Sequence, residues 1–296
     1  MSQTSAQARP ALGALGKLSA FFQSIKVEHT VFALPFAYLS LFLASGGVPS
    51  LANFIWITVA MATARTFAMG MNRLIDVSID ASNPRTARRA LPAGLISKGQ
   101  YLALCLGAFA LFLVAAYELN PIVRWLWPAV LFGMVAYPYG KRFTWACHLM
   151  LGIVYLMVPP SVWLAATGEL PAGAIWLGFA AGCWVAGFDV IYTTQDVEND
   201  HKQRLHSLPA DFGVARGLLA ARLLHLLTAA FLLVAGLVLG LGGWYFAGVG
   251  VASLLLVYEH SLVSPKDLSR LNEAFFLMNG IISVVLFLFV LAEVLV

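Results

Sequence analysis

Long apolar runs separated by short polar segments extend along the chain. Because an α-helix needs about 20 residues to cross the hydrocarbon core of a bilayer, each run predicts a transmembrane helix. The pattern therefore predicts an all-α integral membrane protein with nine transmembrane helices in one bundle. The predicted spans are residues 29–47, 51–72, 100–118, 122–140, 146–167, 171–192, 216–240, 243–262 and 274–295.

The composition supports a membrane protein. Of the 296 residues, 60% are hydrophobic and only 11% are charged, whereas soluble domains carry about 25% charged residues. The formal net charge of +4 fits contacts with anionic lipid headgroups and gives no reason to expect a nucleic-acid partner. The lipid bilayer is the partner that the composition predicts.

Two parts of unequal size make up the predicted organisation. Residues 1–28 contain only short apolar patches, which favours an amphipathic segment at the membrane interface, with Phe21, Phe22 and Ile25 facing lipid. Residues 29–296 form a single transmembrane domain.

The basic residues are distributed unequally between the two ends of the predicted helices. By the positive-inside rule the end rich in Lys and Arg is cytoplasmic, so the N-terminus is expected inside and the C-terminus outside a cell's inner (plasma) membrane. Only Arg124 lies at the other end, and Arg65 lies within a span. The remaining sixteen of the eighteen are Arg9, Lys17, Lys26, Arg73, Arg85, Arg88, Arg89, Lys98, Lys141, Arg142, Lys202, Arg204, Arg216, Arg222, Lys266 and Arg270.

Two loops on the predicted cytoplasmic face are long and polar. They follow the second and sixth spans and cover residues 76–99 and 193–215, whereas the loops on the opposite face are short. Long polar loops on one face predict a cap over a site.

The second span ends in regularly spaced polar residues, Asn72, Asp76 and Asp80. Residues four apart share one face of a helix. Two carboxylates at that spacing repel each other by about 3 kcal/mol at an effective dielectric near 20. The pattern therefore predicts a nearby cation.

The sixth span ends in a similar way. Asp189, Tyr192, Asp196 and Asp200 share a helical face, and the last three match the first set at an offset of 120 residues. We interpret this as a weak parallel internal repeat.

Two carboxylate clusters at one membrane face indicate a functional site. A solvated helix end is the alternative for a single cluster. Oxygen ligands without nearby His or Cys favour Mg²⁺, which proteins hold with one or two carboxylates and substrate phosphates. A diphosphate shared between two carboxylate–magnesium groups would explain both clusters.

Basic residues near the clusters fit an anionic ligand, although the positive-inside rule also explains many of them. Arg73, Lys141 and Arg142 lie on the same predicted side as the clusters. Arg65 lies two turns before Asn72, inside a span where an unpaired Arg costs at least about 2.5 kcal/mol.

These motifs resemble the UbiA superfamily of intramembrane aromatic prenyltransferases. The family pattern is NxxxDxxxD after the second helix and DxxxD after the sixth, and this chain has both. Supporting stretches are "EHTVFALPFA" (28–37), "NPRTARRALPAG" (83–94) and "YPYGKRFT" (137–144). The resemblance covers roughly residues 25 to 295 and implies nine helices around a central cavity.

The resemblance also implies roles. Asp76, Asp80, Asp196 and Asp200 would hold two Mg²⁺ ions that bind the diphosphate of a polyprenyl donor. Other site residues follow from the same resemblance: Asn72 as a neutral metal ligand that also lies at the diphosphate, Arg65, Arg73, Lys141 and Arg142 as diphosphate contacts, and Asp189 and Tyr192 as candidates near the acceptor ring. For Tyr192 a packing role is an equal alternative.

Two alternatives concern function. Within the family, residues 192–213 are most similar to the 4-hydroxybenzoate polyprenyltransferase-like branch, which includes enzymes that prenylate 1,4-dihydroxy-6-naphthoate on the futalosine route to menaquinone. "KQRLHS" (202–207) departs from the stretch typical of the hydroxybenzoate enzymes, so both aromatic acceptors stay open, in ubiquinone or menaquinone synthesis. The alternative from another class is a cation-coupled transporter with intramembrane Asp residues, although transporter sites usually lie near the bilayer midplane.

Overall fold

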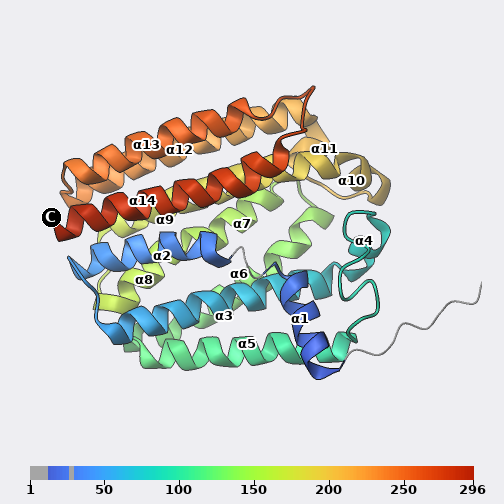
Figure 1. Ribbon diagram of the computed structural model, residues 1–296, viewed down its shortest axis with the longest axis horizontal. Helices are drawn as coiled ribbons and strands as arrows, with labels where there is room; N and C mark the ends of the chain where they lie inside the picture. The colour runs from blue at the N-terminus through green and yellow to red at the C-terminus, as the bar shows by residue number, and fades with distance from the viewer. Residues whose placement is uncertain (1–12, 27–29) are drawn as a thin grey trace, which may run out of the picture.

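The computed structural model describes residues 13–26 and 30–296 and is an all-helical bundle (Figure 1), with no β-strand in these ranges. This confirms the predicted fold class. The elements are α1 (Ala14–Ser24), α2 (Thr30–Ser45), α3 (Leu51–Ile75), α4 (Val77–Ser82), α5 (Lys98–Glu118), η2 (Pro121–Trp125), α6 (Trp127–Ala136), η3 (Tyr137–Arg142), α7 (Cys147–Leu156), α8 (Val158–Thr167), α9 (Ala172–Thr193), η4 (Thr194–Asp196), α10 (Val197–Gln203), α11 (Leu208–Phe212), α12 (Val214–Leu239), α13 (Gly243–Ser261), the π-helix η5 (Glu273–Met278) and α14 (Asn279–Leu295).

Six helical segments of the described chain are long and apolar enough to cross a membrane, so the protein is a multi-pass membrane protein. They begin at α3, α5, α7, α9, α12 and η5, and each falls on a predicted span. The span from Cys147 to Thr167 bends at Met157, between α7 and α8. Pro159 and Pro160 follow this bend, and a proline lacks the N–H that would continue the helical hydrogen bonds.

The other three predicted spans are helical but shorter or more polar. α2 has 16 residues. The span predicted at 122–140 consists of η2, α6 and η3, and each of these begins with a proline at its first or second position. α13 is 19 residues long, but Glu259 and His260 lower the hydropathy of its last turns. The count of nine transmembrane helices therefore remains a prediction.

α9 is the most enclosed of the six segments. It packs along α12 and α7, and 67% of the residues in its apolar stretch are buried. Gly152 of α7 and Gly182 of α9 allow this close approach, since a Cβ on Gly182 would lie 2.8 Å from the Gly152 carbonyl oxygen. Small residues at helix crossings are typical of membrane bundles. The close packing fixes the helix that carries Asp189 and Tyr192.

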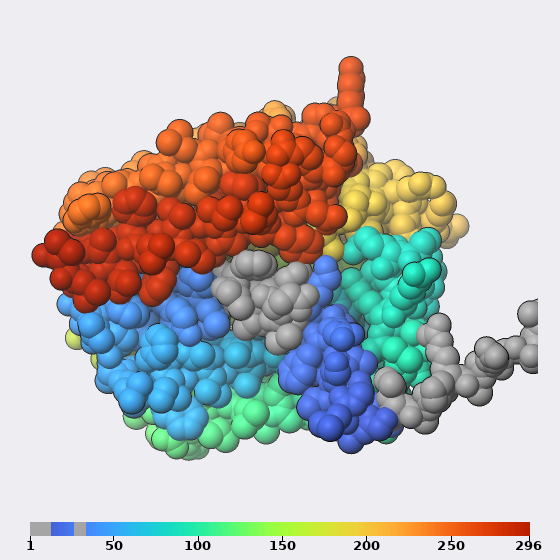
Figure 2. All heavy atoms as spheres, in the orientation of Figure 1, coloured from blue at the N-terminus to red at the C-terminus, as the bar shows by residue number. Residues whose placement is uncertain are grey.

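α3 and α9 end at the same end of the bundle, where α4, α10 and α11 also lie (Figure 1). We call this the motif end, because the chain there carries both aspartate motifs. In Figure 2 the teal surface of α4 and its following segment meets the yellow surface of α10 and α11. The two long polar loops therefore come together.

α1 crosses the bundle in front of α3 and α5 (Figure 1), and here the structure corrects an expectation. Phe21 and Ile25 are 2% and 0% exposed, whereas Phe22 is 36% exposed. The Phe21 ring packs edge-on against Tyr101 of α5, with ring centroids 4.7 Å apart. Only Phe22 of the three faces outward, because the apolar side of this helix covers protein. Residues 1–12 and 27–28 of the predicted interfacial segment lie outside the described residues.

Candidate active site

A cavity of about 470 Å³ runs from the motif end into the bundle. Its deeper wall is apolar and includes Ile57, Met61, Val123, Trp127 and Val162. Of the eleven predicted site residues, all but Asp76 and Arg142 line the cavity. The nine that do are Arg65, Asn72, Arg73, Asp80, Lys141, Asp189, Tyr192, Asp196 and Asp200.

Asp76 lies at the junction of α3 and α4 and is 1% exposed. Its carboxylate contacts Lys141 Nζ at 2.5 Å and Arg142 Nη2 at 2.9 Å. Arg142 also donates to the carbonyl oxygens of Ile75 and Pro138, each at 2.9 Å. The two cations predicted for the diphosphate therefore hold the first aspartate of the motif, and only Lys141 also lines the cavity.

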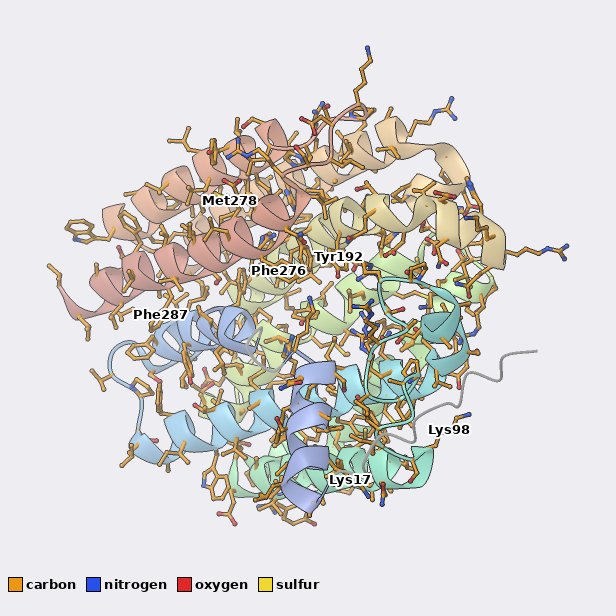
Figure 3. The ribbon with its side chains drawn as sticks, turned by 45° about the vertical axis from the view of Figure 1, so that its right-hand side comes forward. Lys17, Lys98, Tyr192, Phe276, Met278 and Phe287 are labelled. Carbon is orange, nitrogen blue, oxygen red and sulfur yellow. The ribbon has the colours of Figure 1, made fainter. Side chains whose placement is uncertain are left out.

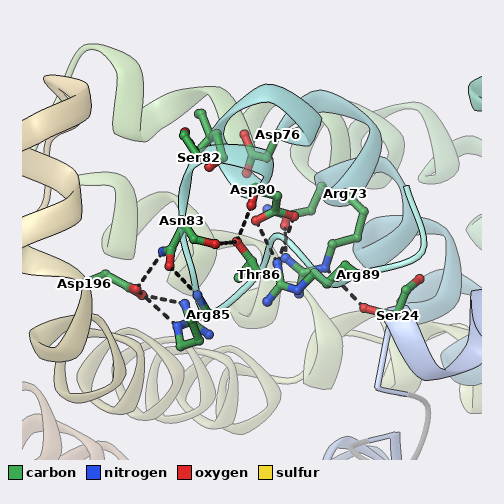
Figure 4. Close-up of polar contacts among 12 residues, drawn as sticks. Ser24, Arg73, Asp76, Asp80, Ser82, Asn83, Arg85, Thr86, Arg89 and Asp196 are labelled. Carbon is green, nitrogen blue, oxygen red and sulfur yellow. Dashed lines mark hydrogen bonds and ion pairs between the residues drawn. The ribbon is translucent and has the colours of Figure 1, made fainter. Parts of the chain in front are cut away.

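Asp80 accepts two hydrogen bonds from Arg89 Nη1, at 2.8 and 2.9 Å (Figure 4). Burial and the nearby charge of Arg73 lower the pKa of Arg89, although Asp80 opposes this shift. Arg73 in turn donates to the side-chain oxygen of Asn72 at 2.9 Å. All four side chains line the cavity.

Asp196 joins the two motif-bearing segments across more than 110 residues of sequence. Arg85 Nη2 contacts its Oδ2 at 2.6 Å and Arg85 Nε donates to its Oδ1 at 3.2 Å (Figure 4). Asn83 Nδ2 donates to the same Oδ1 at 3.1 Å. Burial lowers the pKa of Arg85, but Asp196 and Tyr192 outweigh this and raise it overall.

Asp200 lies one turn after Asp196 on α10 and lines the cavity. Ser207 Oγ donates to its Oδ2 at 3.3 Å. The same hydroxyl accepts a hydrogen bond from Ala210 N and so caps α11.

Asp189 lies closer to the centre of α9, with its side chain 26% exposed. His148 Nδ1 lies 2.7 Å from Asp189 Oδ2, and this histidine is 1% exposed. Neither His148 nor Asn83 was predicted as a site residue. Asn83 was noted only as part of residues 83–94, a stretch that resembles the family. His148 is a lone polar residue in an apolar span, and no regular spacing relates it to other polar residues.

Tyr192 lies in an aromatic wall beside Asp189. Its ring stacks on Phe275 with centroids 4.1 Å apart, and its hydroxyl accepts a hydrogen bond from Arg85 Nη1 at 2.8 Å. Figure 3 shows Tyr192 next to Phe276 of the π-helix, whose ring centroid lies 6.1 Å away. All of these side chains line the cavity, so Tyr192 has both a packing contact and a polar contact.

Arg65 is held at the cavity wall nearer the bundle centre. Its Nη1 donates to the Lys26 carbonyl oxygen at 3.4 Å. This places a predicted cation on the cavity side of α3.

The donor atoms at the motif end suit Mg²⁺. Asn72, Asp80, Asp196 and Asp200 bring hard oxygen ligands to one cavity. In residues 13–26 and 30–296, no three His, Cys, Asp or Glu side chains come close enough to enclose a metal alone. This agrees with an ion held by one or two carboxylates and completed by substrate phosphates.

Curated relatives match most of the chain. The 4-hydroxybenzoate octaprenyltransferase of Aromatoleum aromaticum is 29% identical over 248 residues, which is 84% of each chain. The protein of the same name from Pseudoalteromonas translucida is 32% identical over 246 residues, covering 80% of this chain and 81% of that one.

Solved structures match the fold. A UbiA homolog from Aeropyrum pernix K1, solved without ligand, superposes with a TM-score of 0.82 at 30% identity, covering 91% of this chain and 99% of that one. A UbiA homolog from Archaeoglobus fulgidus bound to GPP and Mg²⁺ gives a TM-score of 0.67 at 21% identity, over 93% and 99% of the two chains. At that identity the likeness shows the fold alone.

A match to a protein family decides between the enzyme and the transporter as the class of this protein. Residues 33–281 match the UbiA prenyltransferase family, which sets the transporter alternative aside. The aspartate motifs, the cavity that they line and this match together show that the chain belongs to the UbiA prenyltransferase family.

Proposed function

We propose that this protein transfers a polyprenyl group from polyprenyl diphosphate to a hydroxylated aromatic acceptor in quinone biosynthesis. The observation that carries the proposal is a single cavity with both aspartate motifs at its polar end and apolar side chains along its depth. A polyprenyl diphosphate has the same two parts. The class of enzyme, a Mg²⁺-dependent aromatic prenyltransferase, follows from the family.

In this proposal the motif end binds the diphosphate. Of the four predicted metal ligands, Asp80, Asp196 and Asp200 line the cavity and would hold two Mg²⁺ ions, with Asn72 as a neutral oxygen ligand. Bound Mg²⁺ supplies charge neutralisation that makes diphosphate a better leaving group. The buried position of Asp76 makes it the anchor of the first motif, because Lys141 and Arg142 already hold its carboxylate.

The cations of the chain stabilise the departing diphosphate. Arg73 and Lys141 line the cavity, and Arg65 lies deeper on the same side of α3. Arg85 and Arg89 join this set through their contacts with Asp196 and Asp80. Preorganised cations at the position of a leaving anion are an effective form of electrostatic catalysis.

The chemistry then proceeds at the allylic carbon. Its C–O bond breaks, and diphosphate leaves with the electron pair. A carbon of the electron-rich acceptor ring attacks the resulting allylic cation, a C–C bond forms, and the ring releases one proton. The aromatic faces of Tyr192 and Phe275 border this region and stabilise positive charge.

Asp189 is the proposed contact for the acceptor. Its carboxylate lines the cavity on α9, two turns before Asp196. There it accepts a hydrogen bond from the acceptor's ring hydroxyl. Tyr192 lies one turn away and orients the acceptor ring.

The proposed setting is the inner membrane, with the motif end in the cytoplasm. Residues 29–296 form one domain of nine transmembrane helices, and the loops after α3 and α9 cap the cavity. The contacts of Asn83 and Arg85 with Asp196 support the cap, because they join these two loops.

A transfer assay tests this function. Purified protein is given labelled polyprenyl diphosphate, Mg²⁺ and either 4-hydroxybenzoate or 1,4-dihydroxy-6-naphthoate. We expect a prenylated product with at least one acceptor, and none after EDTA. Transfer that continues in EDTA, or a product only with a non-aromatic acceptor, would contradict the proposal.

A further inference from the structure

His148 is a buried titratable residue that the reaction described above does not use. It lies in the first turn of α7 and is 1% exposed, and it does not line the cavity. It therefore cannot touch a substrate directly. Its ring nitrogen Nδ1 nevertheless lies 2.7 Å from the carboxylate of Asp189, which does line the cavity.

The second ring nitrogen fixes the direction of this hydrogen bond. The backbone N–H of Leu208 lies 3.4 Å from His148 Nε2. A backbone N–H only donates, so Nε2 accepts and Nδ1 carries the proton that is donated to Asp189.

The partner of Nε2 belongs to the segment that follows the second aspartate motif. Ser207, the residue before Leu208, donates to Asp200. Two adjacent residues of one loop therefore contact both a carboxylate of the metal motif and the histidine that holds Asp189. The same loop therefore holds residues of both the proposed diphosphate site and the proposed acceptor site.

We propose that His148 is a positioning residue for the aromatic acceptor, an inference that rests on the proposed function. Its Nδ1–H holds Oδ2 of Asp189, so that Oδ1 is oriented to accept the hydrogen bond of the acceptor's ring hydroxyl. Among the described residues, only His148 hydrogen-bonds to this carboxylate. This one hydrogen bond fixes the side chain through Oδ2 and leaves Oδ1 available to the acceptor's hydroxyl.

Three substitutions of His148 test the inference in the transfer assay. His148→Leu removes both hydrogen bonds, and we expect kcat/KM for the acceptor to fall by about tenfold to a hundredfold, the usual effect of losing a hydrogen bond to a charged group. His148→Asn places an amide near Nδ1 and should recover much of this loss. His148→Gln places its amide near Nε2 and should recover less. KM for the prenyl diphosphate should stay nearly unchanged in all three.

A double-mutant cycle separates positioning from general packing. In an Asp189→Asn background, His148→Leu should cause little further loss in kcat/KM for the acceptor, because the carboxylate on which it acts is already gone. Losses that simply add would overturn the inference. His206→Asn is the matched control, since the side chain of this nearby histidine is 44% exposed, pairs with Asp211 and does not line the cavity.

Failure of the inference differs from failure of the proposed function. A folded wild-type protein that prenylates no acceptor contradicts the proposed function. An active wild-type protein whose three His148 variants keep the wild-type KM and kcat/KM for the acceptor contradicts only the role of His148. If His148→Leu does not fold, the comparison of His148→Asn with His148→Gln decides, and equal values for the two would overturn the inference.

Discussion

Asp76 and Asp80 stand four residues apart in one motif, yet different surroundings hold them. Asp76 is enclosed by two cations from η3, whereas Asp80 faces the cavity with Arg89. The first residue therefore anchors the motif and the second presents it to a ligand. Of the two cations that hold Asp76, we therefore expect Arg142 to act mainly in stability and Lys141, which lines the cavity, to act also in catalysis.

Substitution of Lys141 and Arg142 tests this difference. Arg142→Ala removes the guanidinium that donates hydrogen bonds to Asp76, Ile75 O and Pro138 O, so we expect a loss of about 1–3 kcal/mol in the free energy of unfolding. Lys141→Ala should mainly lower kcat/KM for the prenyl diphosphate, because Lys141 lines the cavity. Denaturant unfolding in detergent and the transfer assay measure the two effects. An Arg142→Ala protein as stable as the wild type would contradict the anchoring role.

Arg85 should need its guanidinium geometry. Its Nε and Nη2 hold Asp196 while Nη1 donates to Tyr192, and a lysine ammonium cannot form this set. We expect Arg85→Ala to lower kcat/KM for the donor by about tenfold or more, and Arg85→Lys to recover only part of it. Arg88→Ala is the control, because Arg88 is exposed and does not line the cavity. Full recovery by lysine would show that charge alone is sufficient.

Sequence patterns identify the motif residues better than their partners. The four-residue spacing identifies Asp76, Asp80, Asp196 and Asp200 because spacing is a local property, although the structure interrupts the α-helix at Asp76 and at Asp196. Asn83 and His148 take part through contacts that span 113 and 41 residues. Such contacts depend on how helices pack, which one sequence does not specify.

At the scale of elements, positions of helices were easier to predict than their continuity. All nine predicted spans contain helix, because a long apolar run in lipid must satisfy its backbone hydrogen bonds internally. The breaks inside 122–140 and at Met157 come from prolines and from packing against neighbours. Hydropathy averages over such breaks. The amphipathic pattern of α1 likewise indicates a buried face but not whether lipid or protein covers it.

The crossing of α7 and α9 should be the most sensitive helix contact near the site. In Gly182→Val the new Cβ would lie 2.8 Å from the Gly152 carbonyl oxygen, and backbone atoms cannot move aside without separating the helices. We expect poor recovery of folded protein and loss of transfer activity, measured by gel filtration in detergent and by the transfer assay. Gly250→Ala should behave like the wild type, since no atom lies within 4 Å of its added Cβ. A folded, fully active Gly182→Val protein would contradict the close packing.

At the scale of the whole molecule, the proposed function requires a defined orientation of the protein in the membrane. Sixteen of the eighteen Lys and Arg residues fall at or near the motif end by sequence, so this end should face the cytoplasm. In a protein without its three native cysteines, Arg88→Cys should react with a membrane-impermeant thiol reagent only when the cytoplasmic face is accessible. Glu169→Cys, on the loop between α8 and α9 at the other end, should react only from outside. The opposite labelling pattern would invert the orientation.

If both aspartate motifs hold one diphosphate through Mg²⁺, binding of the prenyl donor must depend on the ion and on each motif. Equilibrium binding of labelled geranyl diphosphate is measured with and without Mg²⁺ in the wild type, Asp80→Asn and Asp196→Asn. A diphosphate site shared by both motifs predicts saturable, Mg²⁺-dependent binding in the wild type and a large loss of affinity in each folded variant. Wild-type affinity in either variant, or binding that does not depend on Mg²⁺, would contradict it.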